Sequence, residues 1–130
     1  MSSNIGVMGH PIGHTKSPIF QQAGLNELGI DETFEAWDVL PEDLEAKVAT
    51  FREKGFIAAC VTLPHKQAVI PMVDELTEAA ESVGAVNWIF NRDGKLIGHN
   101  TDCNGFLRAL KEEAGFDPKG ADAVVFGAGG

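Results

Sequence analysis

Short apolar runs alternate along this chain with longer segments in which apolar residues recur at helical spacing. The apolar runs lie at residues 4–8, 56–61, 85–90 and 96–98, and residues 33–39 alternate between apolar and polar, which also predicts a strand. The helical patterns lie at 17–28, 41–54 and about 100–114. Residues 62–84 hold two prolines and acidic helical stretches. Strand and helix signals that alternate at this spacing favour βα units. The sequence therefore predicts an α/β fold, with a mainly parallel sheet flanked by helices.

Local signals mark several of the element boundaries. Ser17 followed by Pro18 is typical of an N-cap and the first position of a helix. Asp93 and Gly94, between two strand-like runs, predict a two-residue hairpin turn. In the helix expected from about residue 100, we expect Phe106 and the leucines that follow it to face inward.

Composition and charge exclude several classes of function. The chain has 130 residues, of which 44% are hydrophobic and 22% charged, as in a soluble globular protein. Its net charge of −9 argues against a nucleic-acid partner and against binding to an anionic membrane. No run approaches membrane-spanning length, and no signal peptide is evident at the start. Cys60 and Cys103 form no CxxC pair, so we expect reduced, partly buried thiols in a cytoplasmic protein.

The end of the chain carries a second, incomplete signal. Residues 122–126 are expected to form a strand because residues 124–126 are an apolar run, and a glycine-rich turn follows directly. Such a turn commonly leads into a helix whose N-terminus binds a phosphate group. The turn consists of Gly127, Ala128, Gly129 and Gly130. We therefore expect this chain to hold only the beginning of a dinucleotide-binding domain.

Polar residues in the loops after strands are the first candidates for a site, because open α/β sheets bind ligands beyond the carboxyl ends of their strands. In GHPIGHTKSP, residues 9–18, the hydroxyls of Thr15 and Ser17 lie at a helix start. They could hold a carboxylate, or Ser17 could merely cap the helix. In VTLPHK, Lys66 could transfer protons, or it could be an ordinary exposed lysine.

Two further loops offer polar groups. Asn87 lies within an apolar run, so its amide must bond either a neighbouring loop or the hydroxyls of a ligand. In GHNTD, Asp102 could cap a helix or could face Lys66 across a cleft. His65 is interpreted as a polar loop residue. No set of ligands has convincing metal-binding spacing, so no metal site is expected.

Five motifs in register make a family resemblance specific. The motifs GHPIGHTKSP, VTLPHK, AVN, NTDCNGF and VVFGAGG, in this order, resemble the shikimate dehydrogenase family over essentially the whole chain. The resemblance implies a substrate-binding domain at residues 1–101. At residues 102–130 it implies a linking helix and the truncated start of an NAD(P)-binding Rossmann domain. A chain of this extent is expected to be inactive by itself.

The reaction implied is the reversible, NADP-dependent reduction of 3-dehydroshikimate to shikimate, a step of chorismate and aromatic amino-acid biosynthesis. NAD is the alternative cofactor, and the partner is a small polyhydroxylated ring carboxylate. A homodimer is left open. The resemblance implies that the catalytic pair is Lys66 and Asp102. The substrate is expected to contact Thr15, Ser17, Thr62, Asn87 and Asp102. The cofactor pyrophosphate is expected to contact Gly127, Ala128, Gly129 and Gly130.

Two positions depart from the family's usual pattern. The family usually has Ser at the position of Thr15, where the added methyl could crowd a carboxylate, and Asn at the position of Cys60. A thiol does not replace the donors and acceptor of an amide. The alternatives are therefore a paralogue acting on quinate, an aminated analogue or another polyol carboxylate, or a non-catalytic small-molecule-binding module. Because a pure binder has no need of both Lys66 and Asp102, the pair favours the enzyme.

Overall fold

The computed structural model describes residues 4–127, so Ala128, Gly129 and Gly130 of the glycine-rich turn lie outside the described residues. The elements, in chain order, are β1 (Ile5–Gly9), α1 (Ser17–Glu27), β2 (Phe34–Asp38), η1 (Pro41–Asp43), α2 (Leu44–Thr50), β3 (Ala58–Val61), η2 (Ile70–Met72), β4 (Glu75–Leu76), α3 (Glu78–Val83), β5 (Trp88–Arg92), β6 (Lys95–His99) and α4 (Asp102–Glu112). The predicted α/β class is confirmed. None of these helices is both long and apolar enough to cross a bilayer.

One mixed sheet of six strands organises the described residues, in the order β2-β1-β3-β5-β6-β4. Strand β1 is parallel to β2 and β3, and β4 is parallel to β6. Strand β5 is antiparallel to both of its neighbours, β3 and β6. Parallel pairings thus outnumber antiparallel ones by three to two among the described strands.

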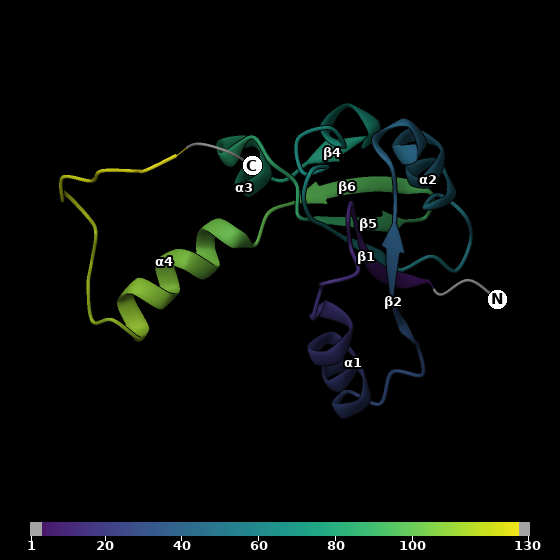
Figure 1. Cartoon of the computed structure of the whole chain (residues 1–130), viewed down its shortest axis with the longest axis horizontal. Coiled ribbons are helices and arrows are strands. Elements are labelled where there is room, and N and C mark those ends of the chain that lie inside the picture. Colours follow the sequence, from purple (N-terminus) through teal and green to yellow (C-terminus); the bar gives the residue numbers. More distant parts are fainter. Residues whose placement is uncertain (1–3, 128–130) are drawn as a thin grey trace.

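The reversal at β5 decides which loops meet. Because β5 runs opposite to β3, its beginning lies beside the carboxyl end of β3. Strand β6 then returns in the direction of β3. One side of the sheet, called here the shared edge, therefore carries the carboxyl ends of β1, β3 and β6 and the start of β5. Helix α4 leaves from this edge and projects away from the sheet (Figure 1).

Both faces of the sheet are covered over β1 and β3, which explains why these strands are apolar throughout. On one face, Met8 joins a cluster with Phe51 and Leu96, beneath α2. On the other face, Val7 joins a cluster with Leu25 of α1. Figure 1 shows α1 and α2 on opposite sides of the sheet. A strand buried on both faces reads as a continuous apolar run.

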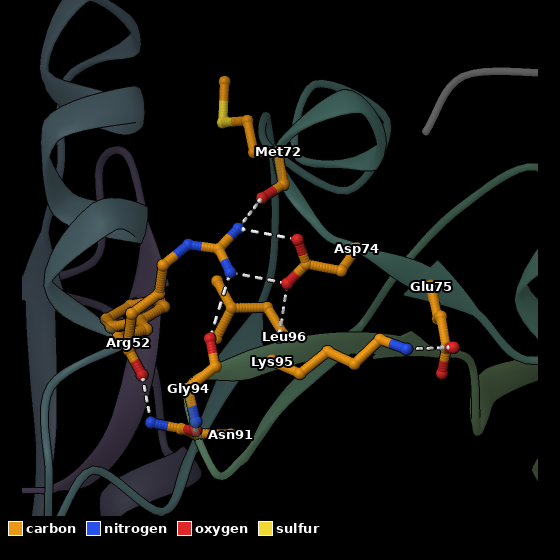
Figure 2. A network of polar contacts seen from close by, with 9 residues as sticks. Arg52, Met72, Asp74, Glu75, Asn91, Gly94, Lys95 and Leu96 are labelled. Carbon is orange, nitrogen blue, oxygen red and sulfur yellow. Dashed lines mark hydrogen bonds and ion pairs between the residues drawn. The ribbon is translucent and has the colours of Figure 1, made fainter.

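The predicted hairpin is confirmed, and a polar network fastens it to α2. Asp93 and Gly94 both have positive φ, 54° and 87°, as a two-residue type I′ turn requires. The guanidinium of Arg52 donates to Gly94 O at 3.1 Å and to both carboxylate oxygens of Asp74, at 2.5 and 3.2 Å (Figure 2). The backbone N–H of Leu96 donates to the same carboxylate at 2.7 Å. The network joins the end of α2 to the strands β4 and β6.

Two expectations for the end of the chain are wrong. Residues 122–126 form no strand, and Phe126 is 96% exposed. A strand needs a neighbour for its backbone hydrogen bonds, and no strand within residues 4–127 pairs with this segment. Phe106, expected to face inward, is 65% exposed, because α4 projects away from the sheet.

Two expectations for the middle of the chain also need correction. Strand β5 begins at Trp88 rather than at residue 85, because the backbone N–H of Val86 donates to Lys66 O in the preceding turn instead of continuing the sheet. Within residues 62–84 the short strand β4, Glu75–Leu76, was not expected. Two residues are too few to show the alternation that identifies a strand.

Candidate active site

An ion pair at the shared edge of the sheet forms the centre of the candidate site. Lys66 lies in the turn that follows β3, and Asp102 is the first residue of α4. The Lys66 Nζ lies 2.7 Å from Asp102 Oδ2, although 36 residues separate them in the chain. The lysine side chain is only 23% exposed, whereas that of Asp102 is 54% exposed. The pair therefore has one half-buried cation and one carboxylate open to solvent.

Buried contacts fix the turn that carries the lysine. The N–H of Thr62 donates to Met8 O at 3.0 Å. His65 is 1% exposed, and its Nε2 lies 2.7 Å from Val39 O. Because a carbonyl oxygen only accepts, that nitrogen carries the proton. A Cβ on Gly9 would lie 2.5 Å from the Thr62 methyl, so the close approach of this turn to β1 requires glycine. That His65 is a buried anchor could not be predicted from the sequence, because its partner lies 26 residues away.

The amide of Asn87 binds the start of α4. Its Nδ2 donates to Thr101 Oγ1 at 2.7 Å and to Asp102 Oδ1 at 3.0 Å, and its Oδ1 accepts from Thr101 N at 2.9 Å. Both amide hydrogens are thus used within the protein, and Asn87 is 5% exposed. Of the two expectations for this residue, the bond to a neighbouring loop is present. The second lone pair of Oδ1 is the capacity left for a ligand.

Asn100 is a polar residue of this edge that was not expected. It is 1% exposed, and its side chain bonds both the start of α4 and Ala85 O. An asparagine just before a helix is a recognisable capping signal, but its bond to a distant carbonyl is not. Asp102 itself makes no cap, and its carboxylate faces Lys66 instead.

The predicted hydroxyl pair lies at the start of α1, after the loop that follows β1, and one detail is corrected. Helix α1 begins at Ser17, so this residue is not its N-cap. Thr15 Oγ1 accepts from Ser17 N at 3.2 Å, because the first N–H groups of a helix lack backbone acceptors. The same hydroxyl donates to Ser17 Oγ at 3.2 Å. Two adjacent hydroxyls at the N-terminus of an 11-residue helix suit a carboxylate.

Cys60 adds a neutral group beside the ion pair. It precedes the lysine turn on β3 and is partly buried, and both cysteines are free. Burial raises the pKa of the Cys60 thiol to about 11, which the positive charge of Lys66 opposes and the charge of Asp102 reinforces. At neutral pH the thiol is therefore protonated. Cys103, expected to be partly buried, is exposed, because it lies on the projecting helix α4. Residues 4–127 hold no cluster of three potential metal ligands.

The fold and the site define the chain as an α/β domain with a lysine–carboxylate pair at the carboxyl ends of its strands. The family model described as the shikimate dehydrogenase substrate binding domain matches residues 7–89. The chain belongs to this family, which confirms the resemblance inferred from the five motifs.

Individual relatives agree with the assignment. A shikimate dehydrogenase (NADP(+)) of Methanopyrus kandleri is 47% identical over 97% of this chain and 43% of its own length. A Thermus thermophilus shikimate 5-dehydrogenase, solved in complex with shikimate, is 37% identical with a TM-score of 0.80. The aligned region covers 85% of this chain and 42% of that one. A 5-ketofructose reductase of Gluconobacter, solved without ligand, is 35% identical with a TM-score of 0.78, over 83% and 39% of the two chains. This chain thus spans about two fifths of the length of the relatives it matches.

Proposed function

We propose that the protein carrying this chain is an oxidoreductase of the shikimate dehydrogenase type, which reversibly reduces 3-dehydroshikimate to shikimate with NADP. The observation that carries the proposal is the Lys66–Asp102 pair, 2.7 Å apart at the edge where open α/β sheets bind ligands. The Methanopyrus relative, named as NADP-dependent, and the shikimate in the Thermus structure support the choice of cofactor and substrate.

The pair suits proton transfer to and from a substrate oxygen. In the direction of reduction, the Lys66 ammonium donates a proton to the oxygen on the reacting carbon. In the direction of oxidation, the neutral amine takes the proton back from that hydroxyl. The Asp102 carboxylate accepts hydrogen bonds from both the lysine and the hydroxyl, and so orients them. NADP, when bound, supplies or accepts the hydride at the same carbon.

The remaining contacts follow from the places of the polar groups. Thr15 and Ser17 would bind the substrate carboxylate, since their hydroxyls are adjacent at the start of α1. Thr62 and Asn87, at the same edge of the sheet as the ion pair, would bind ring hydroxyls.

The proposed cofactor-binding domain begins where the substrate-binding domain ends. Residues 102–130 would start a second domain, and the projection of α4 from the sheet supports this division (Figure 1). Gly127 has a φ of +90°, a conformation that side chains rarely adopt, so it fits a glycine-rich turn around a pyrophosphate. Gly127 with Ala128, Gly129 and Gly130 would hold that group through backbone N–H donors.

A second candidate function is the reversible oxidation of a different polyol. Cys60 places a protonated thiol beside the catalytic pair, and Thr15 adds a methyl to the hydroxyl pair. The likeness to a 5-ketofructose reductase indicates that related folds serve other polyols. Quinate and aminated ring carboxylates are the alternatives to test, together with a binding module that has no activity.

The deciding experiment is a steady-state assay of the full-length protein with NADP⁺ or NAD⁺ and with shikimate or quinate. We expect NADP-selective turnover of shikimate. Lys66→Met should lower kcat by about 10²- to 10⁴-fold, as expected for the loss of a general acid–base group, with little change in KM. Lys95→Met is the matched control, because Lys95 forms an ion pair with Glu75 away from the site.

Each other outcome has a definite meaning. Turnover of quinate or another polyol but not of shikimate identifies the paralogue. Binding of shikimate without turnover of any substrate identifies a binding module. Full activity of the Lys66→Met variant refutes the role of the ion pair, whatever the substrate.

A further inference from the structure

Asn100 is buried between β6 and α4 and bonds two separate segments. Its Oδ1 accepts from the backbone N–H of Asp102 at 2.9 Å and from that of Cys103 at 3.3 Å. Its Nδ2 donates to Ala85 O at 3.0 Å. The first N–H groups of a helix lack backbone acceptors, and the side chain of Thr101 does not cap α4. Asn100 therefore supplies the cap and also attaches it to a distant strand connection.

The segment that receives this bond is itself bonded to the lysine turn. Val86, which follows Ala85, donates its N–H to Lys66 O at 2.8 Å. The backbone of Asp102 is thus linked to the backbone of Lys66 through Asn100 and residues 85–86. The side chains of the same two residues meet at 2.7 Å. The hydrogen bonds that run from Asp102 through Asn100 and residues 85–86 to Lys66, called here the bridge, close a ring with the ion pair.

Helix α4 is largely exposed, so the hydrogen bonds at its first turn hold its start in place. Residues 101–108 are exposed, and α4 projects from the sheet (Figure 1). The start of the helix is held at its first turn by the amides of Asn87 and Asn100. Asn87 touches the Asp102 carboxylate directly. Within residues 4–127 the Asn100 side chain hydrogen-bonds backbone groups alone, so its influence on the carboxylate is through the position of the helix.

We propose that Asn100 is a positioning residue, which sets the backbone of Asp102 relative to the lysine turn and thereby holds the carboxylate against Lys66. The role in turnover rests on the proposed function. The structural part, that the bridge fixes the ion pair, does not. A misplacement of about 1 Å in a reacting group can cost about 10²-fold in rate, so the bridge has a measurable consequence.

Two substitutions of Asn100 separate its cap of α4, which uses Oδ1, from its bond to Ala85 O in the bridge, which uses Nδ2. Asn100→Ala removes both. Asn100→Asp keeps an acceptor for the two N–H groups of α4, but its ionised carboxylate has no hydrogen to donate to Ala85 O. Asn91→Ala is the matched control, because Asn91 is an asparagine with three comparable bonds at the other edge of the sheet. Its Nδ2 donates to Phe51 O at 2.7 Å and Glu53 O at 3.1 Å, and its Oδ1 accepts from Gly94 N at 2.7 Å.

The test measures Tm, kcat and KM of these variants in the full-length protein, with a double-mutant cycle against Asp102→Asn. We expect both alanine variants to lower Tm, and only the Asn100 variants to lower kcat, by about 10- to 100-fold with little change in KM. If Asn100 acts through the carboxylate, Asn100→Ala should add almost nothing to Asp102→Asn. A loss of kcat no larger than that of Asn91→Ala, or a fully additive loss, overturns the proposal.

Crystal structures of wild type and of Asn100→Asp decide the structural part without any activity. We expect the Lys66–Asp102 distance to lengthen beyond hydrogen-bonding range in the variant. An unchanged ion pair overturns the proposal even if the enzyme is active. An inactive wild type, with an ion pair that opens in the variant, overturns the proposed function and leaves the positioning role supported. Because Asn100→Asp retains the helix cap, it remains informative if Asn100→Ala fails to fold.

Discussion

The protonation of Cys60 tests the electrostatics of the candidate site most directly. Burial raises the pKa of this thiol from its ordinary value of 9.0 to about 11, against the opposing charge of Lys66. The thiolate is the reactive form of cysteine. At about pH 8 the higher pKa lowers the thiolate fraction from about 10% to about 0.1%, so we expect alkylation about 100-fold slower than that of an ordinary thiol.

Labelling with iodoacetamide, followed peptide by peptide by mass spectrometry, measures this rate, and the exposed Cys103 provides a reference in the same sample. The perturbation is Lys66→Met. Removal of the positive charge that lowers the pKa of Cys60 should slow its labelling further, whereas Lys95→Met should not. Labelling of Cys60 as fast as an exposed thiol, or acceleration by Lys66→Met, would refute the assignment of a buried neutral thiol beside the cation.

Three further predictions concern separate parts of the molecule. Gly9→Ala puts a Cβ 2.5 Å from the Thr62 methyl, so urea denaturation should show that the free energy of unfolding falls by about 1–3 kcal/mol. The control Gly13→Ala, whose Cβ would have no atom within 4 Å, should change the stability little. Equal losses in the two variants contradict the packing argument. Ser17→Ala removes one hydroxyl of the proposed carboxylate site and should raise KM for shikimate about tenfold at nearly constant kcat; a change confined to kcat speaks against that site. A hydrogen bond from the Arg52 guanidinium lowers the pKa of the Asp74 carboxyl from its ordinary value of 3.8. The stability that this bond adds is therefore present above pH 3.8 and is lost as pH falls through the lower pKa of the folded state. Acid denaturation of Asp74→Asn should therefore begin to converge with that of wild type as pH falls below about 3.8, and should match it below the lower folded pKa, whereas a constant gap counts against the assignment.

The parts of the fold that the sequence predicts well are those with local causes. Strand β1 is apolar throughout because both of its faces are covered, and this shows directly in its residues. The turn at Asp93 and Gly94 requires positive φ at both positions, which these residue types tolerate. The expected strand at 122–126 has the right residues but no pairing strand within the described chain. A strand depends on its neighbour, and composition does not supply one.

The candidate site divides in the same way. Lys66 and Asp102 follow from the family resemblance of their motifs, because their positions alone also fit an exposed lysine and a helix cap. The structure brings the two side chains together. The anchoring roles of His65 and Asn100 could not be predicted, because their partners are carbonyls of Val39 and Ala85 in other segments. Any residue type offers a backbone carbonyl. Such a bond leaves no trace in the sequence of the partner.

The place of Asp102 at the very start of α4 has a mechanical consequence. The helix has 11 residues and is therefore about 16 Å long. If α4 tilts by about 10° around its bonded first turn, its far end moves by about 3 Å, by the same helix dimensions. The Asp102 carboxylate lies at the fixed first turn and hardly moves. A tilt of α4 can therefore move the segment that follows Glu112 toward or away from the sheet while the Lys66–Asp102 ion pair stays closed.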